Sequence, residues 1–481
     1  MAILIKNGTL ITASETFQAD ILIEGEKIIQ IGKDLQHPSA DMIDASGKLI
    51  LPGGIDPHTH FDLPMFGTVS SDDHYTGHKA AAFGGTTTVM DFVVLESPPP
   101  DGRGVRGESD FQYSVDLWLE KAAKAAIDYS FHMNLTRLDE ALAKEIPALR
   151  EMGITTLKVF TAYNGRLRLD DGNIFRALRI AKENGMLVMA HCENGDVIET
   201  LIPEALAVGH TTPEWHALTR PAWGAVESTL RVAGMAAEAD APVYIVHMNA
   251  GGEVDMLRYA RERGVKVMGE TCPPYLFFTI DHLRRPDGAK WICSPPMRTE
   301  KDNARLWEGL ANGTLQTIGT DHCPFFFDGT KAIVYEGNEI AIPGKELGQD
   351  DFTKIPNGLP GVQDRMPILW TYGVRAGRIS ANQFVAYTST NPAKIFGLYP
   401  RKGTLLPGSD ADIVIWDPEK KVKYGVAHSH QRTDYSLYEG WELVGYPEKV
   451  FLRGKLIVDG ELWLGKSGQG NFLKRSEGQV L

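Results

Sequence analysis

Residues suited to metal binding and acid–base chemistry follow several apolar segments of this chain. His58 and His60 are two positions apart, so on an extended strand both side chains project to the same face and can bind one ion. His191 and His247 each end an apolar run, and Asp321 lies in the segment TDHCP. Singly, each has an ordinary alternative as a turn, core or backbone-bonding residue. Together they predict a metal centre.

Lys158 lies inside the apolar segment TTLKVF. A charged lysine without a partner is costly in such a strand unless it is neutralised or modified. The alternative is a lysine that reaches the rim of the sheet or pairs with a carboxylate. His132 and His322 also lie near strand ends, but they exceed the ligands that two ions need, and they are left unassigned.

The elements that must position these residues are eight short apolar segments, most of them separated by helix-like stretches. The segments are GIDPHTHFD, TTTVMDF, YSFHMNL, TTLKVF, MLVMAHCEN, VYIVHMN, VKVMGETC and QTIGTDHC. Apolar residues at helical spacing predict helices over 116–127, 175–185, 253–264 and 303–313. Near-continuous apolar strands alternating with helices predict an α/β fold, a (β/α)8 TIM barrel with its chemistry at the carboxyl ends of the strands.

Both ends of the chain carry a different pattern, short strand runs broken by turn residues. This pattern covers 2–50, 408–418 and 448–463, and it predicts one small β-sandwich domain built from both termini. The expected division is 1–53 and 397–465 for the β-sandwich, 54–396 for the hydrolase barrel and 466–481 for a C-terminal tail that could contact a neighbouring subunit.

Composition limits the partners of the chain. Its 481 residues are 43% hydrophobic and 23% charged, as in an ordinary globular protein. The net charge of −13, without a cluster of Lys and Arg, argues against nucleic acid. No apolar stretch approaches the roughly 18 residues of a membrane helix. The four cysteines form no C-x-x-C pair, and no export signal is evident, so we expect a cytoplasmic protein without a membrane partner.

The segments GIDPHTHFD, LKVFTAY, AHCEN, VHMNAGG, ETCPPYL, CSPPMR, GTDHCPF and IPNGLPG closely resemble the D-hydantoinase/dihydropyrimidinase group of the amidohydrolase superfamily. The resemblance extends over roughly 2–475. It implies a dinuclear metal-dependent cyclic amidohydrolase that opens dihydropyrimidines or 5-substituted hydantoins to N-carbamoyl amino acids. It also implies two divalent ions, usually zinc, bridged by a carboxylated lysine. The ligand positions carry over onto His58, His60, Lys158, His191, His247 and Asp321.

The same resemblance implies a role for each substrate-side residue. A hydroxide bridging the metals would attack the ring carbonyl, with Asp321 as general base and then acid. Tyr163 would donate to the oxyanion, although a loop aromatic at the barrel rim is the alternative. The remaining positions are Ser294 and Asn357 for the ring imide, largely through backbone groups, and Met65, Phe160 and Leu167 for an apolar pocket around the exocyclic substituent, where ordinary core packing is the alternative.

Three features depart from the pattern of the group. The segment 328–345 is longer than the usual connection, and it could overhang the site or an oligomer contact. Asn164 and Pro274 stand where lysine and glutamine are common. Arg166 and Arg168 flank Leu167 and could favour polar or anionic substituents, although exposed loop arginines are the commoner explanation.

Three rival functions remain open. Dihydroorotases resemble this group but carry arginine two residues after the second histidine, where this chain has Asp62. Allantoinase is separable only by assay. A non-catalytic scaffold of the same fold would have lost metal ligands, and all six positions are filled here. Members of the group are commonly homotetramers, which we also expect for this chain.

Overall fold

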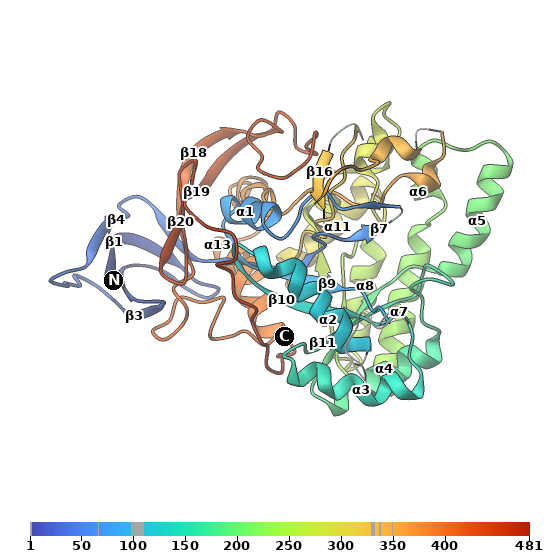
Figure 1. Ribbon diagram of the computed structural model, residues 1–481, viewed down its shortest axis with the longest axis horizontal. Helices are drawn as coiled ribbons and strands as arrows, with labels where there is room; N and C mark the ends of the chain where they lie inside the picture. The colour runs from blue at the N-terminus through green and yellow to red at the C-terminus, as the bar shows by residue number, and fades with distance from the viewer. Residues whose placement is uncertain (1, 66, 98–109, 329–331, 336–337, 349) are drawn as a thin grey trace.

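The chain forms a parallel barrel beside a mixed sheet (Figure 1). The computed structural model describes residues 2–65, 67–97, 110–328, 332–335, 338–348 and 350–481. Eight parallel strands make the barrel, and each of the eight predicted segments supplies one of them, so the predicted fold class is confirmed. In hydrogen-bonded order they are β15 (Thr317–Ile318), β14 (Val267–Thr271), β13 (Val243–Ile245), β12 (Leu187–His191), β11 (Thr156–Phe160), β10 (Asp128–Asn134), β9 (Thr86–Val93) and β6 (Gly54–Thr59).

The barrel is nearly closed where β6 meets β15. Arg365 is buried there, and its Nη1 donates to the carbonyl of Ile55 at 2.8 Å and to that of Ile318 at 3.0 Å. The amide of His60 donates to the carbonyl of His322 at 2.8 Å. These bonds hold together the two strand ends that carry predicted ligands.

The barrel strands are largely buried on both faces, because helices cover the outside and side chains fill the inside. Every residue of β9, β10 and β12 is buried, as expected for a parallel sheet in this setting. Met90, Met189, Tyr244 and Met268 pack in one cluster of buried side chains. The interior of the barrel is therefore a packed core that supports the residues at its carboxyl end.

The helices begin slightly earlier than the sequence pattern predicted. Asp170 and Thr299 accept the amide protons of Asn173 and Asp302 and so cap α4 and α11 at their N-termini. The helix predicted over 116–127 is wrong at its end, because α2 stops at Lys121 and a 3-10 turn, Ala122–Lys124, leads into the extended segment before β10. The helices are α1 (Thr76–Phe83), α2 (Asp110–Lys121), α3 (Glu140–Glu151), α4 (Asp171–Glu183), α5 (Gly195–Ala207), α6 (Glu214–Leu218), α7 (Ala222–Glu238), α8 (Gly251–Arg261), α9 (Pro273–Phe277), α10 (Ile280–Leu283), α11 (Glu300–Ala311), α12 (Arg365–Leu369), α13 (Ala381–Val385) and α14 (Asn391–Ile395).

The second domain contains strands from both termini, as predicted, joined in one nine-stranded mixed sheet. β5 and β18 pair antiparallel, with Ile50 opposite Ile415, and this pair joins the two ends of the chain. Ile5, Ile21 and Phe451 belong to the buried cluster of this domain. Its strands are β1 (Ala2–Ile11), β2 (Thr16–Glu24), β3 (Lys27–Gly32), β4 (Asp41–Asp44), β5 (Leu49–Pro52), β18 (Ile413–Lys423), β19 (Glu442–Leu452), β20 (Lys455–Asp459) and β21 (Leu462–Trp463).

A buried ion cluster joins the sheet to the barrel. Lys402 is 1% exposed, and its Nζ lies 2.6 Å from Asp128 at the start of β10, 2.7 Å from Asp412 and 3.1 Å from Asp410. Arg453 of the sheet domain also pairs with Asp128. Removing one partner from such a cluster leaves uncompensated buried charge, so the pairs hold the two domains in one relative position.

The C-terminal tail lies against the barrel of its own chain. The amide of Tyr129 donates to the carbonyl of Asn471 at 3.0 Å, and the amide of Leu473 donates to the carbonyl of Tyr129 at 2.7 Å. Leu473 is buried, whereas Val480 and Leu481 are exposed. The tail therefore extends the edge of β10 locally, and its contact with a neighbouring subunit stays a prediction.

Two hairpins complete the described strands: β7 (Pro64–Met65) with β8 (Thr68–Val69), and β16 (Ala332–Tyr335) with β17 (Asn338–Ala341). The second lies in the expected insertion 328–345, part of which falls outside the described residues. Thr68 donates to the carbonyl of Pro343 at 2.7 Å, and Ile342 packs with Val69. The end of the insertion thus contacts the hairpin that carries Met65.

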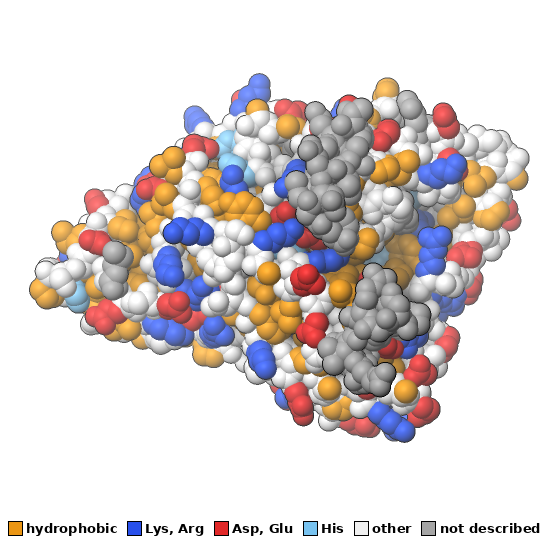
Figure 2. Space-filling model, in the orientation of Figure 1, with side chains coloured by type: hydrophobic (Ala, Val, Ile, Leu, Met, Phe, Trp, Pro, Cys, Tyr) orange, Lys and Arg blue, Asp and Glu red, His pale blue; other side chains and the backbone are white. Residues whose placement is uncertain are grey.

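The surface of the described residues carries charges of both signs. On the face drawn in Figure 2, acidic and basic side chains of the described residues are interspersed, without a broad basic patch. Among the described helices, none has the length and apolar character needed to cross a membrane. All four cysteines are buried and free of disulfide bonds.

Candidate metal centre and substrate cavity

Three predicted ligands converge where β6 meets the end of β15. Asp321 Oδ1 lies 3.2 Å from His58 Nε2 and 3.0 Å from His60 Nε2. One ligand atom from each residue lies within 4.8 Å of the others, so the three can bind one cation. Asp321 has a φ of +52°, a conformation that aspartate adopts more readily than most residues.

Charge coupling within this trio favours bound cations. Burial alone would raise the pKa of Asp321, but the charge of His58 and hydrogen bonds from His58 and His60 hold it well below its usual range. Burial would lower the pKa of His58, but Asp321 and Glu270 raise it to about 9. The carboxylate therefore stays ionised, and a metal ion would take the place of the proton on His58.

The two other predicted histidines form a second group beside the first. His191 Nδ1 lies 3.0 Å from His247 Nε2, so one nitrogen of each ring faces the same point. The ring centroids of His58 and His247 are 5.4 Å apart. The donor atoms of β6, β12 and the end of β13 are thus assembled at one end of the barrel.

Lys158 lies between these groups on β11 without an ionic partner. It is 2% exposed, and its Nζ is 4.9 Å from the centroid of the Phe92 ring and 5.3 Å from that of Phe160. In the described part of the chain, no hydrogen bond or ion pair involves this amine. Burial lowers the pKa of Lys158 to about 8, which makes the neutral amine accessible near neutral pH.

Two buried carboxylates that the sequence reasoning missed orient the histidines. Glu270 Oε1 lies 2.7 Å from His58 Nδ1, and Glu193 Oε2 lies 2.9 Å from His191 Nε2. Burial alone would raise the pKa of Glu193, but Arg220 and His191 lower it to about 2. Histidines that bind metals commonly donate their other ring nitrogen to a carboxylate, so these pairs fit a metal centre. The segments AHCEN and GETC contain both glutamates, but nothing in their spacing indicates this role.

A cavity of about 260 Å³ opens onto these groups. Every residue predicted for the site lines it. These lining residues are His58, His60, Lys158, His191, His247, Asp321, Tyr163, Ser294, Asn357, Met65, Phe160 and Leu167.

The polar wall of the cavity contains Tyr163, Ser294 and Asn357. The ring centroid of Tyr163 is 5.3 Å from that of His191, and burial raises the pKa of Tyr163 to about 12. Asn357 Nδ2 donates to Ser294 Oγ at 3.0 Å. A Cβ at Gly358 would lie 2.2 Å from the carbonyl oxygen of Cys323, so the backbone of this loop packs directly on the strand end that carries Asp321.

Comparison with known proteins places this site in a family. The model of the amidohydrolase family matches residues 49–457, most of the chain. The chain belongs to the amidohydrolase family. Its relatives narrow the group further: a D-hydantoinase of Geobacillus stearothermophilus is 44% identical over 481 residues, which cover 99% of this chain and 97% of that protein. The predicted D-hydantoinase/dihydropyrimidinase group is confirmed.

Solved structures agree with this amidohydrolase assignment. The crystal structure of dihydropyrimidinase from Brevibacillus agri has a TM-score of 0.93 at 46% identity and covers 100% of both chains. The L-hydantoinase (dihydropyrimidinase) from Arthrobacter aurescens has a TM-score of 0.85 at 27% identity and covers 98% of this chain and 99% of that chain. The barrel and the mixed sheet are therefore shared across the whole length.

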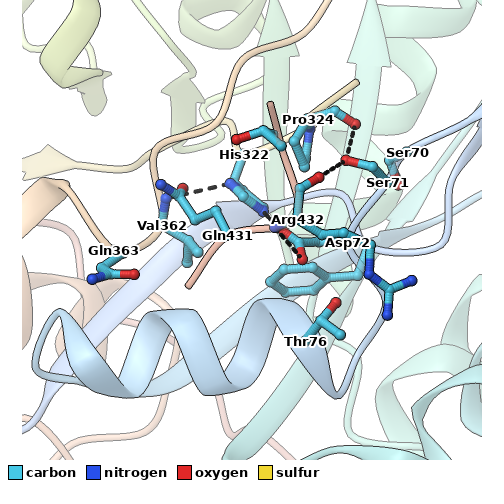
Figure 3. A network of polar contacts seen from close by, with 12 residues as sticks. Ser70, Ser71, Asp72, Thr76, His322, Pro324, Val362, Gln363, Gln431 and Arg432 are labelled. Carbon is cyan, nitrogen blue, oxygen red and sulfur yellow. Dashed lines mark hydrogen bonds and ion pairs between the residues drawn. The ribbon is translucent and has the colours of Figure 1, made fainter. Parts of the chain in front are cut away.

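The two histidines left unassigned belong to the support of the amidohydrolase site. His322 Nδ1 accepts from the amides of Gly361 and Val362 at 3.1 and 3.3 Å, so its Nε2 donates to Asp72 at 3.1 Å (Figure 3). Asp72 also accepts from the amide of Arg432. This network ties the residue after Asp321 to a loop that follows β18.

His132 lies deeper in the barrel. Its Nε2 is 3.0 Å from the carbonyl of Pro57, and its Nδ1 is 2.6 Å from Thr156 Oγ1. Both ring nitrogens are engaged, so His132 is a core residue beneath the centre.

The two loop arginines differ in their surroundings. Arg168 Nη1 lies 2.5 Å from Asp196 and 2.9 Å from Asn164, so it is held in a surface cluster. Arg166 lines the cavity. Of the two, only Arg166 is placed to meet a substrate.

Proposed function

We propose that this chain opens cyclic amides, dihydropyrimidines and 5-substituted hydantoins, by hydrolysis to N-carbamoyl amino acids. The observation that carries the proposal is that one cavity is lined by four histidines from the ends of three strands, together with Asp321, the buried Lys158, Tyr163 and an apolar wall. Its relatives are named D-hydantoinase and dihydropyrimidinase, which supports this substrate class.

In this proposal His58, His60, Lys158, His191, His247 and Asp321 hold two divalent cations, with zinc as the expected metal. The neutral amine of Lys158 adds to CO2 and releases a proton, which gives a carbamate. The carbamate replaces a buried amine that has no ionic partner among the described residues. When bound, the cations would supply positive charge that polarises the ring carbonyl and makes water more acidic.

Asp321 then moves the proton. Its Oδ1, held by His58 and His60, takes a proton from the attacking water and returns it to the leaving ring nitrogen. Tyr163 keeps its hydroxyl proton at neutral pH because burial raises its pKa to about 12, so it donates to the carbonyl oxygen as negative charge develops. Ser294 and Asn357 hold the imide, largely through backbone groups.

Met65, Phe160 and Leu167 form the apolar side that receives the exocyclic substituent. We expect the D-enantiomer to be preferred, because the D-hydantoinase of Geobacillus stearothermophilus is 44% identical to this chain, whereas the L-hydantoinase structure is 27% identical. Asp62, at the position of the dihydroorotase arginine, pairs with Lys124 at 3.1 Å and does not line the cavity, so nothing here favours dihydroorotate. We further expect a cytoplasmic homotetramer, which light scattering would test for its size.

The test is a turnover panel with the zinc-loaded enzyme. Dihydrouracil, dihydrothymine, hydantoin and racemic phenylhydantoin should be hydrolysed, with the N-carbamoyl product identified by chiral chromatography. Allantoin and dihydroorotate are the comparison substrates. Exclusive turnover of either comparison substrate, or no turnover with two metal ions bound, would contradict the proposal.

A further inference from the structure

Lys345 is a second buried lysine near the cavity, and it has no carboxylate partner among the described residues. It is 1% exposed, and its Nζ donates to the carbonyl oxygen of Ile292 at 3.0 Å and to that of Pro356 at 3.0 Å. Burying an amine is costly, and burial lowers the pKa of Lys345 to about 7. A neutral amine still has two N–H bonds, one for each carbonyl.

The two carbonyls precede the residues that form the polar wall of the cavity. Ile292 precedes Cys293 and Ser294, and Pro356 precedes Asn357. A peptide unit is planar, so the direction of each carbonyl also sets the direction of the following amide N–H. Holding the carbonyls of both segments therefore orients the amides of Cys293 and Asn357, two residues that line the cavity.

These amides are available to a ligand. Among the described residues, no hydrogen bond uses the backbone N–H of Cys293, Ser294 or Asn357. The two segments also contact each other, because the amide of Gly358 donates to the carbonyl of Ile292 at 3.1 Å. Cyclic imides present two carbonyl oxygens beside an N–H, and backbone donors in a fixed relative position match that pattern.

We propose that Lys345 is a positioning residue for ring recognition: by joining the carbonyls of Ile292 and Pro356, it sets the relative position of the two backbone segments that receive the substrate ring. The inference rests on the proposed function. Lys345 is itself fixed, since its amide donates to the carbonyl of Phe326 at 2.8 Å, close to the strand end that carries Asp321. Lys345 thus links the two backbone segments that receive the ring to the segment that follows Asp321.

A purely structural role for this lysine predicts a different result from a positioning role. Loss of a structural contact lowers thermal stability and leaves the KM of the remaining folded enzyme unchanged. Loss of positioning weakens ground-state binding of the ring, so KM rises while the proton transfer at Asp321 continues. A rise in KM therefore indicates a positioning role, whereas a loss of thermal stability with unchanged KM indicates a purely structural role.

The test compares Lys345→Met with Lys354→Met in the zinc-loaded enzyme. Methionine keeps the length of the side chain and removes every donor. Lys354 is the matched control because its side chain is 68% exposed and pairs with Asp351 in the same segment. For dihydrouracil or hydantoin, whichever the wild type hydrolyses faster, K345M should raise KM roughly tenfold and change kcat less than about threefold. Metal content should match that of the wild type.

Lys345→Gln keeps two N–H donors on a shorter, neutral side chain, so its KM should lie between those of the wild type and K345M, and it serves where K345M fails to fold. An unchanged KM in K345M, or in K345Q where only that variant folds, would overturn the inference, as would a fall in kcat alone. If the wild type hydrolyses no cyclic amide, the proposed function itself fails, which is a distinct result.

Discussion

Three buried lysines show, at the scale of single residues, how a buried amine can be accommodated in different ways. Lys402 pairs with three carboxylates, and Lys345 donates to two carbonyls. Among the described residues, Lys158 Nζ has neither kind of partner within hydrogen-bonding distance, and it lies over the rings of Phe92 and Phe160. The proposed modification of Lys158 would resolve this difference, because a carbamate would turn an unpaired cation into a metal ligand.

Lys158→Gln should therefore remove metal as well as activity. Glutamine is neutral and polar but cannot form a carbamate, so we expect the bound metal to fall from about two ions per chain to one or fewer and kcat to fall at least about 1000-fold. Elemental analysis and a turnover assay measure the two effects. Lys182→Gln, at an exposed lysine on α4, is the control. A K158Q enzyme with full metal content and activity would exclude a bridging carbamate.

Tyr163→Phe tests the oxyanion donor separately from the metals. In the proposed mechanism Tyr163 donates only as charge develops on the carbonyl oxygen, so kcat should fall about 100-fold, with KM little changed and metal content unchanged. Tyr259→Phe, an exposed tyrosine of α8, is the control. A rise in KM with kcat preserved would instead assign Tyr163 to ground-state binding.

The sequence predicted the residues that touch the cavity better than those behind them. His191 and Asp321 were recognisable because they end apolar strands, and barrel closure brings such ends together. Glu270 and Lys345 could not be predicted, since their roles depend on contacts with His58 and with the carbonyl of Ile292, which lie far away from them in the chain. Such contacts have no local spacing signal.

At the scale of elements, strands were easier to predict than helix ends and loops. The barrel strands could be recognised as nearly continuous apolar segments, because almost all of their residues are buried in the fold. The start of α4 depends on a cap by Asp170, and the start of α8 on a buried carboxylate. Glu253 Oε2 accepts from the amides of Asn249 and Ala250 at 2.9 Å each, which orients the turn after His247.

The buried carboxyl of Glu253 should make the stability of the fold depend on pH. Burial raises its pKa from 4.5 to about 7 in the folded chain. Between these values the unfolded chain releases a proton that the folded chain retains, so this group lowers stability as pH rises and adds no further change above pH 7. The glutamine of Glu253→Gln does not titrate. The difference between the thermal midpoint of the variant and that of the wild type should therefore rise from pH 5 to pH 8. A scan at fixed rate measures it, with Glu262→Gln at the exposed end of α8 as the control. A difference that does not change with pH would contradict the assignment.

At the scale of the whole molecule, a chain of contacts connects the C-terminal tail, which lies on the outside of the barrel, to the strand that carries His58. Arg475 is buried and donates to the carbonyl of Phe131 and, at 2.8 Å, to Thr156 Oγ1. Thr156 contacts His132, which in turn contacts the carbonyl of Pro57, the residue before His58. The sequence could not predict this chain of contacts, because Arg475 lies among polar residues that read as a solvent-exposed tail.

Arg475→Met should therefore act on both stability and metal retention. It leaves the Thr156 hydroxyl and the Phe131 carbonyl without their donor, and we expect the thermal midpoint to fall by about 3 to 6 °C. Because the contacts reach the residue before His58, zinc should also leave faster when a chelator is added. Lys474→Met is the matched control, since its exposed side chain lies on the opposite side of the same extended segment. If the two variants lose zinc at equal rates, the tail stabilises the barrel without reaching the metal centre.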